Sequence, residues 1–270
     1  MKINEARSKI RNSHFGKKSK KLLNEWINHE SIGGVGMGLF EVPPVIERAK
    51  GSYLYDCEGK EYLDFLSGFS VSALGNNNEE ITKIIIDQSQ KLTHYFDFPH
   101  PERIKLAHKL CDISGIKGKN SVIFGVTGSD AIELAIRVAR YYTGKPYILT
   151  AHGDYHGVTY GTMGLTTKGG MHPYFHPARP NMDVGYFPFP HPYRKPTDKY
   201  PGYDINSLRI FQQTLEGKET VYTDGLNNIN NVAAILVEPF QSSAGYYIPR
   251  KEYLKILREI ADRHGMLLIV

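Results

Sequence analysis

Apolar residues follow two different spacings along the chain. Between residues 53 and 65 they alternate with polar residues around Glu58 and Gly59, a pattern typical of a β-hairpin. From residue 76 onward, segments with helical spacing alternate with short apolar runs, which predicts an α/β fold with a mostly parallel sheet. We expect helices over residues 81–92, 102–111, 130–142 and 251–264. We expect strands over residues 121–126, 147–150, 232–237 and 266–270.

The helix expected over residues 130–142 is the most strongly periodic. Gly144 follows it, at a position where a left-handed residue often ends a helix. The apolar face of this helix consists of Ala131, Leu134, Ala135, Val138 and Tyr142.

Three segments lack a core-forming pattern. Residues 1–30 predict a polar, solvated helical arm, and the glycine-rich residues 31–38 predict a flexible boundary. Residues 166–204 are rich in Pro, His, Tyr and Gly. We expect a long irregular excursion there, which compact domains usually keep only for a binding role.

Charge and composition narrow the class of protein. The formal net charge of +5 is concentrated near the N-terminus, where the basic residues between Lys2 and Lys21 are opposed only by Glu5. Such a cluster can bind nucleic acid, but no aromatic residues interleave it and no nucleic-acid motif occurs elsewhere, so a solvated helix is favoured. No apolar run approaches the roughly 20 residues that cross a bilayer, and no secretory signal is present, so we expect a cytoplasmic protein. Cys57 and Cys111 form no CxxC pair, and the sequence indicates no metal site.

The most informative stretch is the junction of an expected strand and an expected helix at Thr127, Gly128 and Ser129. The first N–H groups of a helix have no internal partner and carry the positive end of its dipole, so such a junction favours a phosphate. Asp130 and Glu133 have capping-box spacing. An ordinary capped helix after a turn explains the same residues.

Two further motifs follow expected strands. Tyr155, His156 and Gly157 combine a ring that can stack on a flat heterocycle with space to admit it. Glu238 is followed by Pro, which ends the strand, and we expect its carboxylate to project into the crevice together with Gln241. Because ligands bind outside the carboxyl ends of parallel strands, the three motifs predict one site.

The order and spacing of these motifs, together with the hairpin and the segment 67–71, resemble class III aminotransferases. These are the ω-amino-acid, ornithine and 4-aminobutyrate type of fold-type-I pyridoxal-phosphate enzymes. The resemblance covers nearly the whole chain. It implies an N-terminal arm and part of a smaller α+β domain at residues 1–75. It implies a truncated cofactor-binding large domain, built on the parallel sheet, at residues 76–270.

The resemblance also implies a role for each motif. The cofactor would be pyridoxal 5'-phosphate, with an amino acid and a 2-oxo acid as substrates and a homodimer as the complete enzyme. The residues implied to bind the cofactor are Thr127, Gly128, Ser129, Tyr155, His156, Glu238 and Gln241. Phe69 and Ser243 would line the substrate pocket.

Two elements of the family pattern are missing up to Val270. In the family, a run like Met266–Val270 leads into an Asp that pairs with the pyridine nitrogen, and a later strand end supplies the Schiff-base lysine. Lys145 and Lys168 lie in turns or loops that nothing in the sequence ties to the site. We therefore expect the C-terminal part to be missing and this chain alone to be inactive. The alternative is a non-catalytic fragment or a split-gene subunit that needs a partner chain for the lysine.

Two departures from the family pattern leave the reaction open. Asn76, Asn77 and Asn78 stand where relatives usually show a Gly-His-x-His-Pro pattern, and Ser243 stands where many relatives keep an acid that gates the site. A decarboxylating or racemising member of the family therefore stays open, as does a phospholigand-binding α/β protein without this cofactor.

Overall fold

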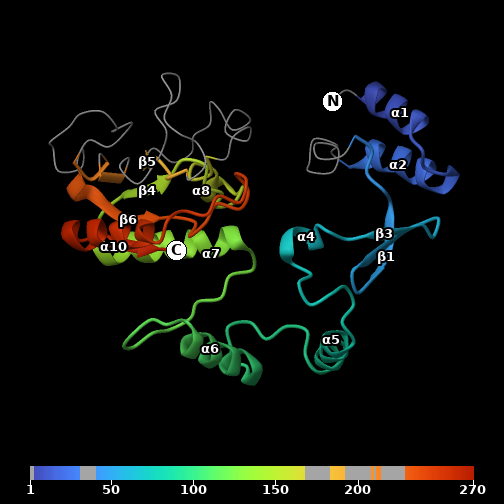
Figure 1. Ribbon diagram of the computed structural model, residues 1–270. Coiled ribbons are helices and arrows are strands. Elements are labelled where there is room, and N and C mark those ends of the chain that lie inside the picture. Colours follow the sequence, from blue (N-terminus) through green and yellow to red (C-terminus); the bar gives the residue numbers. More distant parts are fainter. Residues whose placement is uncertain (1–2, 31–40, 168–182, 192–207, 210, 214–228) are drawn as a thin grey trace, which may run out of the picture. The chain divides into compact units, whose positions relative to one another are not determined.

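The computed structural model describes residues 3–30, 41–167, 183–191, 208–209, 211–213 and 229–270 (Figure 1). Contacts divide the chain into two compact units, Met1–Ile104 and Lys105–Val270. This division falls later in the chain than the domain boundary predicted at residue 75. The glycine-rich residues 31–38 lie outside the described residues.

Unit 2 is built on a parallel sheet with the strand order β5-β4-β6-β7. The strands are β4 (Tyr147–Ala151), β5 (Val184–Phe187), β6 (Val232–Leu236) and β7 (Leu267–Ile269). In the register, Leu149 of β4 lies opposite Gly185 of β5 and Ile235 of β6. The strands predicted from the apolar runs at 147–150, 232–237 and 266–270 are confirmed, and β6 is buried along its whole length.

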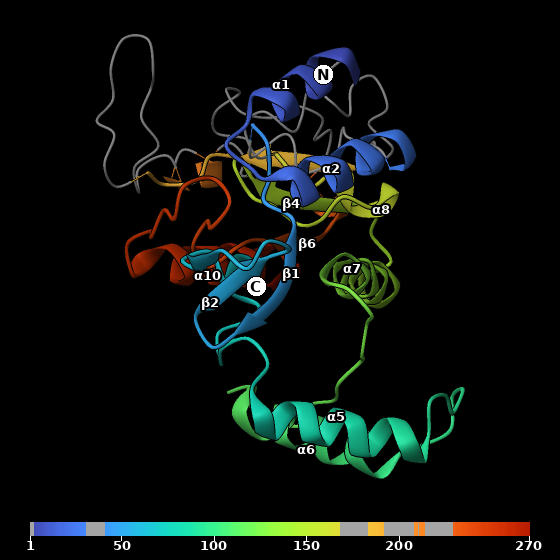
Figure 2. The same cartoon turned by 90° about the vertical axis from the view of Figure 1, so that its right-hand side faces the viewer.

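Two helices cover different faces of this sheet (Figure 2). Helix α10 (Glu252–His264) packs Tyr253, Leu257 and Ile260 against one set of strand side chains. Helix α7 (Gly128–Thr143) packs Ile136 and Ala139 against the other. The unit also contains the single turn α8 (Tyr160–Met163) and the 3-10 turn η2 (Ile229–Asn231).

The strand predicted over residues 121–126 is wrong. This segment runs irregularly into α7, and Val126 is 95% exposed. A strand exists only when its N–H and C=O groups pair with a neighbour, and no strand among the described residues takes this segment as its partner. The expectation of an irregular segment over 166–204 is also wrong where β5 occurs. Residues 168–182 and 192–204 lie outside the described residues.

The face assigned to the helix around residues 130–142 needs correction. The helix and its left-handed end at Gly144 are confirmed. The residues that meet the sheet are Ile132, Ile136 and Ala139, whereas Val138 and Tyr142 of the predicted apolar face are exposed. The helix carries apolar residues on two sides, and only the position of the sheet decides which side is covered.

Unit 1 contains an antiparallel sheet of β1 (Ile46–Lys50), β2 (Tyr53–Asp56) and β3 (Glu61–Leu63). The predicted hairpin is confirmed, and β1 adds a third strand. Helices α1 (Ile3–Asn12) and α2 (Lys17–His29) form a pair with its own small core. The expectation of a polar, solvated arm is therefore wrong on one side of each helix, which buries Ala6, Ile10, Leu23 and Ile27.

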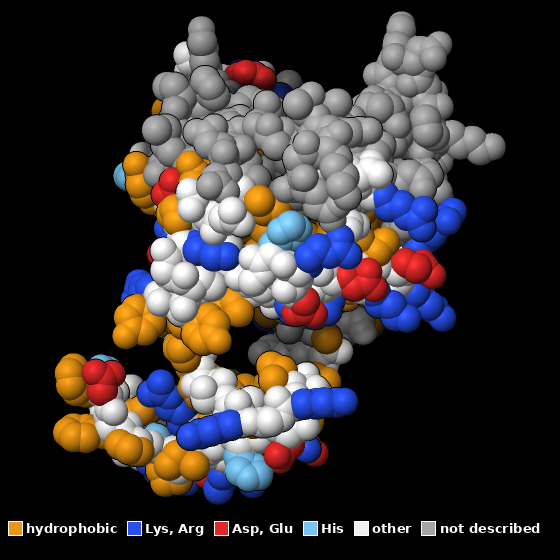
Figure 3. Space-filling view, turned by 90° about the vertical axis from the view of Figure 1, so that its left-hand side faces the viewer, with side chains coloured by type: hydrophobic (Ala, Val, Ile, Leu, Met, Phe, Trp, Pro, Cys, Tyr) orange, Lys and Arg blue, Asp and Glu red, His pale blue; other side chains and the backbone are white. Residues whose placement is uncertain are grey.

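The rest of unit 1 consists of the turn α4 (Ser67–Ser70) and helices α5 (Glu79–Lys91) and α6 (Pro101–Ile113), the last of which runs on into unit 2. Both predicted helices are confirmed, yet neither α5 nor α6 contains a buried residue. Hydrophobic side chains accordingly reach the surface, as Figure 3 shows for one face. Among the described residues, no helix has the length and apolarity that crossing a membrane requires.

The three consecutive asparagines each have a local function. Asn76 pairs with Gly51 through both backbone groups, and the Asn77 side chain donates to the Ala49 carbonyl. Asn78 caps α5, because its side-chain oxygen accepts the N–H groups of Glu80 and Ile81.

Candidate active site

The N-terminus of α7 is held by a reciprocal pair of side-chain bonds. The Thr127 hydroxyl accepts the N–H of Asp130 at 3.1 Å, and the Asp130 carboxylate accepts the N–H of Val126 at 2.9 Å. The capping box predicted for Asp130 and Glu133 is therefore wrong. The capping bonds are formed one turn earlier, by Thr127 and Asp130. Glu133 instead accepts a hydrogen bond from the Thr159 hydroxyl, which ties α7 to the loop after β4.

The cap leaves the next backbone groups free for a ligand. Among the described residues, the N–H groups of Gly128 and Ser129 have no hydrogen-bond acceptor. A Cβ at Gly128 would meet no atom within 4 Å, so the backbone is open from this side. Unpaired N–H groups at the positive end of a 16-residue helix form a site that favours a phosphate.

Gly157 brings the second motif to this helix end. A Cβ at Gly157 would lie 2.1 Å from the Ser129 hydroxyl oxygen, and its φ of 118° is one that other residues rarely adopt. The approach of the two loops therefore depends on glycine. This contact places the residue after Tyr155 and His156 against the candidate phosphate site.

Tyr155, two residues before Gly157, is 37% exposed. Its backbone N–H donates to Glu238 Oε1 at 2.9 Å, while Glu238 Oε2 accepts the N–H of Ser242 at 3.1 Å. The carboxylate of Glu238 thus binds two backbone segments rather than projecting freely. It joins the loop after β4 to the loop after β6.

His156 and Gln241 lie beneath the surface of the site. His156 is 6% exposed, and its Nε2 lies 2.9 Å from the Thr150 hydroxyl. The buried Gln241 amide donates to the His152 carbonyl and to Asp154 Oδ1, both at 2.8 Å. Their contact with a cofactor stays a prediction, because both side chains are engaged by the protein.

The residue that sequence reasoning missed is Asp154, which is fully buried. Its Oδ1 accepts the Gln241 amide, its Oδ2 accepts the N–H of Glu238 at 3.3 Å, and the same oxygen lies 3.5 Å from His156 Nε2. A charged residue directly before the Tyr-His-Gly motif was the one available signal, since a carboxylate in such a place must find donors.

Phe69 and Ser243, the residues predicted to line the substrate pocket, belong to different units, and their role stays a prediction. Phe69 belongs to unit 1, where it is 64% exposed with φ 57° in the left-handed turn α4. Ser243 is half-buried in the loop that follows Gln241. Lys145 donates to the His264 and Gly265 carbonyls at 3.2 Å, so it caps α10, and Lys168 lies outside the described residues.

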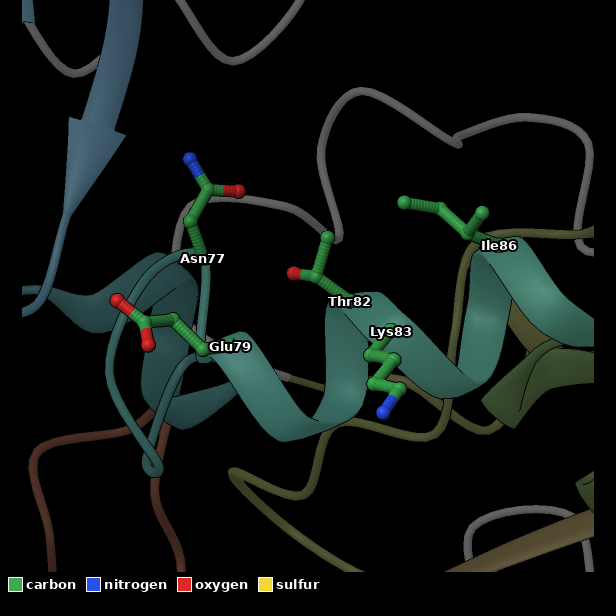
Figure 4. Close-up of a pocket in the computed structure, with 5 residues that line it drawn as sticks. All are labelled: Asn77, Glu79, Thr82, Lys83 and Ile86. Carbon is green, nitrogen blue, oxygen red and sulfur yellow. The ribbon is translucent and has the colours of Figure 1, made fainter.

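Two hollows lie in unit 1, away from the predicted cofactor-binding residues in sequence. A hollow of about 320 Å³ lies at the start of α5 in unit 1, with Ile86 among its lining residues (Figure 4). It contains none of the predicted site residues. Within the described ranges, no three His, Cys, Asp or Glu side chains come together as a metal site requires.

Comparison with known proteins gives the family. The class-III aminotransferase model matches residues 39–270, so the chain belongs to this family, whose cofactor is pyridoxal phosphate. A leucine/methionine racemase of Thermococcus litoralis is 37% identical over 84% of this chain and 50% of its own length. An acetylornithine aminotransferase of Archaeoglobus fulgidus is 29% identical over 84% of this chain and 52% of its own length. The chain spans about half the length of the curated relatives it matches.

Solved structures agree with the fold. A Bacillus anthracis aminotransferase superposes with a TM-score of 0.76 at 25% identity, over 95% of this chain and 56% of that one. The fold-type-I assignment is therefore confirmed, with a parallel sheet between helices in the large unit.

Proposed function

We propose that the chain forms the phosphate-binding and ring-binding side of a pyridoxal-phosphate site in an enzyme that moves an amino group between an amino acid and a 2-oxo acid. The observation that carries this proposal is the contact of Ser129 with Gly157 beside the open N-terminus of α7. It brings a phosphate cradle and a stacking ring into one region. Family membership supplies the reaction class.

The residues of this chain fit the cofactor at its phosphate end. The N–H groups of Gly128 and Ser129, which the Thr127 cap leaves unpaired, would donate hydrogen bonds to the phosphate, and the Ser129 hydroxyl would add a further donor. Tyr155 would cover one face of the ring, and Glu238 fixes the backbone from which that ring extends. When bound, pyridoxal phosphate supplies the electron sink for chemistry at the amino-acid α-carbon.

Substrates, assembly and location complete the proposal. The small-molecule partners are an amino acid and a 2-oxo acid, and Phe69 and Ser243 line the substrate pocket. The complete enzyme is a cytoplasmic homodimer. The alternative form is a non-catalytic or split-gene subunit that receives the lysine from a partner chain.

Racemisation is the second candidate reaction. The leucine/methionine racemase is more similar to this chain than the acetylornithine aminotransferase, at 37% against 29% identity. Ser243 in place of a gating acid suits a site that handles one amino acid rather than alternating between two substrates.

One assay on the native full-length protein tests both reactions. The protein is loaded with pyridoxal phosphate and incubated with single L-amino acids, with and without a 2-oxo acid, and products are separated on a chiral column. Transamination turns over only when an acceptor is present, because without one each cofactor takes up a single amino group and the reaction stops after one equivalent of 2-oxo acid. Racemisation produces the D-amino acid without an acceptor. A protein that binds no pyridoxal phosphate in equilibrium dialysis contradicts the proposed function in either form.

A further inference from the structure

Two loops at the carboxyl edge of the sheet are joined by two carboxylates that act in opposite directions. Asp154, from the loop after β4, accepts the backbone N–H of Glu238. Glu238, from the loop after β6, accepts the backbone N–H of Tyr155. Each carboxylate therefore fixes the backbone of the other loop. The two loops are 84 residues apart in sequence, so no local turn imposes this arrangement.

Asp154 is the inner member of this pair. Its side chain is fully buried, so its charge is compensated only by the donors around it. Its other oxygen holds the Gln241 amide, which also donates to the His152 carbonyl. Gly153 permits this approach, because a Cβ there would lie 2.7 Å from Gln241 Oε1.

We infer that Asp154 is the positioning residue of the site: through its bonds to Glu238 and Gln241 it sets the place of Tyr155 beside the cofactor. This inference rests on the proposed function. Asp154 is fully buried and both of its carboxylate oxygens accept protein donors, so it acts through Glu238 and Tyr155 rather than as a catalytic residue.

Both carboxylates act electrostatically on one buried side chain of α10. Tyr253 of α10 is fully buried, and among the described residues its hydroxyl has no hydrogen-bond partner. Burial, together with the negative charges of Asp154 and Glu238, raises the pKa of Tyr253 well above its usual value. The tyrosine therefore stays neutral.

The test is Asp154→Asn in the native full-length protein. The variant keeps an acceptor for the Gln241 amide but turns an NH₂ group toward the N–H of Glu238, where donor faces donor. We expect the cofactor-free variant to bind pyridoxal phosphate about tenfold more weakly, the effect of losing one bond to a charged group. We also expect a changed circular dichroism of the bound cofactor, because the ring of Tyr155 has moved.

Asp56→Asn is the matched control. Asp56 is a second buried aspartate, 2% exposed, and accepts three hydrogen bonds within the hairpin of unit 1. A general loss of stability would affect both variants, whereas the dichroism of the cofactor should change only in Asp154→Asn. Unchanged affinity and dichroism in Asp154→Asn overturn the inference and leave the proposed function intact. A wild-type protein that binds no pyridoxal phosphate overturns both.

Hydrogen exchange of the wild-type protein decides the question if Asp154→Asn does not fold. The amide protons of Tyr155 and Glu238 should exchange slowly and at similar rates, because each is held by the other loop. The amide of the exposed Val158 is the reference in the same loop. Exchange of the first two as fast as that of Val158 overturns the inference.

Discussion

The hairpin of unit 1 and the candidate site of unit 2 are each organised by a buried aspartate, but the partners come from different distances along the chain. Asp56 accepts the N–H groups of Glu58 and Lys60 and the hydroxyl of Tyr62, all within six residues. Asp154 accepts hydrogen bonds from Glu238 and Gln241, which lie 84 and 87 residues further along the chain. The hairpin turn can form early and alone, whereas the site exists only after the sheet has assembled.

The electrostatic consequences follow the same division. In the hairpin, burial opposes ionisation of Asp56, but the bonds from Lys60, Tyr62 and Glu58 outweigh it and lower its pKa. Burial and the bond to Asp56 raise the pKa of Tyr62 to about 12. A local turn thus compensates its charge with its own backbone. The site compensates Asp154 by joining two loops, which is why a change there should affect ligand binding as well as stability.

The largest expected loss of stability comes from a change where Gly157 meets Ser129 at the start of α7. Gly157→Ala adds a Cβ that would lie 2.1 Å from the Ser129 hydroxyl, at a φ of 118°. We expect destabilisation by about 3 kcal/mol from strain and overpacking together. Urea unfolding of unit 2, followed by hydrogen exchange in β4 and β6, measures it.

Gly144→Ala is the control for backbone strain alone. Gly144 has φ 67°, but a Cβ there meets nothing within 4 Å. We expect this variant to be destabilised by about 1 kcal/mol. Equal losses in the two variants would mean that Ser129 and Gly157 are not in contact.

The features that the sequence predicts correctly depend on neighbouring residues, and those that it misses depend on residues far apart in the chain. The hairpin and the helices depend on local spacing. Three of the four predicted strands were confirmed because their apolar runs pair in the parallel sheet, where β4 and β6 are almost entirely buried. The failures are non-local. Residues 121–126 have a strand pattern, but no strand in the described part of the chain pairs with them. Helix α7 has two apolar sides, of which the sheet covers one. Asp154 was missed because its partners follow more than 80 residues later.

The second largest loss of stability is expected from a change at Gln241, a long-range partner of Asp154. Gln241→Leu removes the amide that donates to the buried carboxylate and to the His152 carbonyl. We expect unit 2 to lose about 2 kcal/mol, the usual loss for a bond to a charged group. Gln90→Leu on the exposed surface of α5 is the control and should change stability by less than about 0.5 kcal/mol. A similar small change in Gln241→Leu would show that Asp154 is satisfied without the amide.

A smaller effect is expected for the local partner of Asp56. Tyr62→Phe removes one of the three bonds to its carboxylate and leaves the two backbone N–H groups in place. We expect the free energy of unfolding of unit 1 to fall by about 1 kcal/mol. Trp26, the single tryptophan, packs against the small core of unit 1 and reports its unfolding by fluorescence. Tyr53→Phe in the same hairpin is the control. A loss in Tyr62→Phe larger than that in Gln241→Leu would reverse the comparison between the two aspartates.

The smallest expected effect is a pH dependence of the stability of unit 1, caused by the carboxylate of Glu58. This carboxylate accepts the Ser19 hydroxyl and the N–H groups of Gly16 and Lys18 at the start of α2. The bond from Ser19, aided by the backbone donors and opposed by burial, lowers the pKa of Glu58. A lowered pKa in the folded state means that its contribution is complete above the ordinary glutamate value of about 4.3 and is lost as pH falls below it.

We therefore expect the unfolding midpoint seen by Trp26 fluorescence to fall between about pH 6 and about pH 3, and to fall less in Glu58→Gln. Glu47 provides the matched control, because it forms an exposed ion pair with Lys18 at 3.1 Å and exposed pairs contribute little. Glu47→Gln should keep the wild-type pH dependence. If Glu47→Gln removes that dependence and Glu58→Gln does not, the helix pair is held by surface charge rather than by the carboxylate at the start of α2.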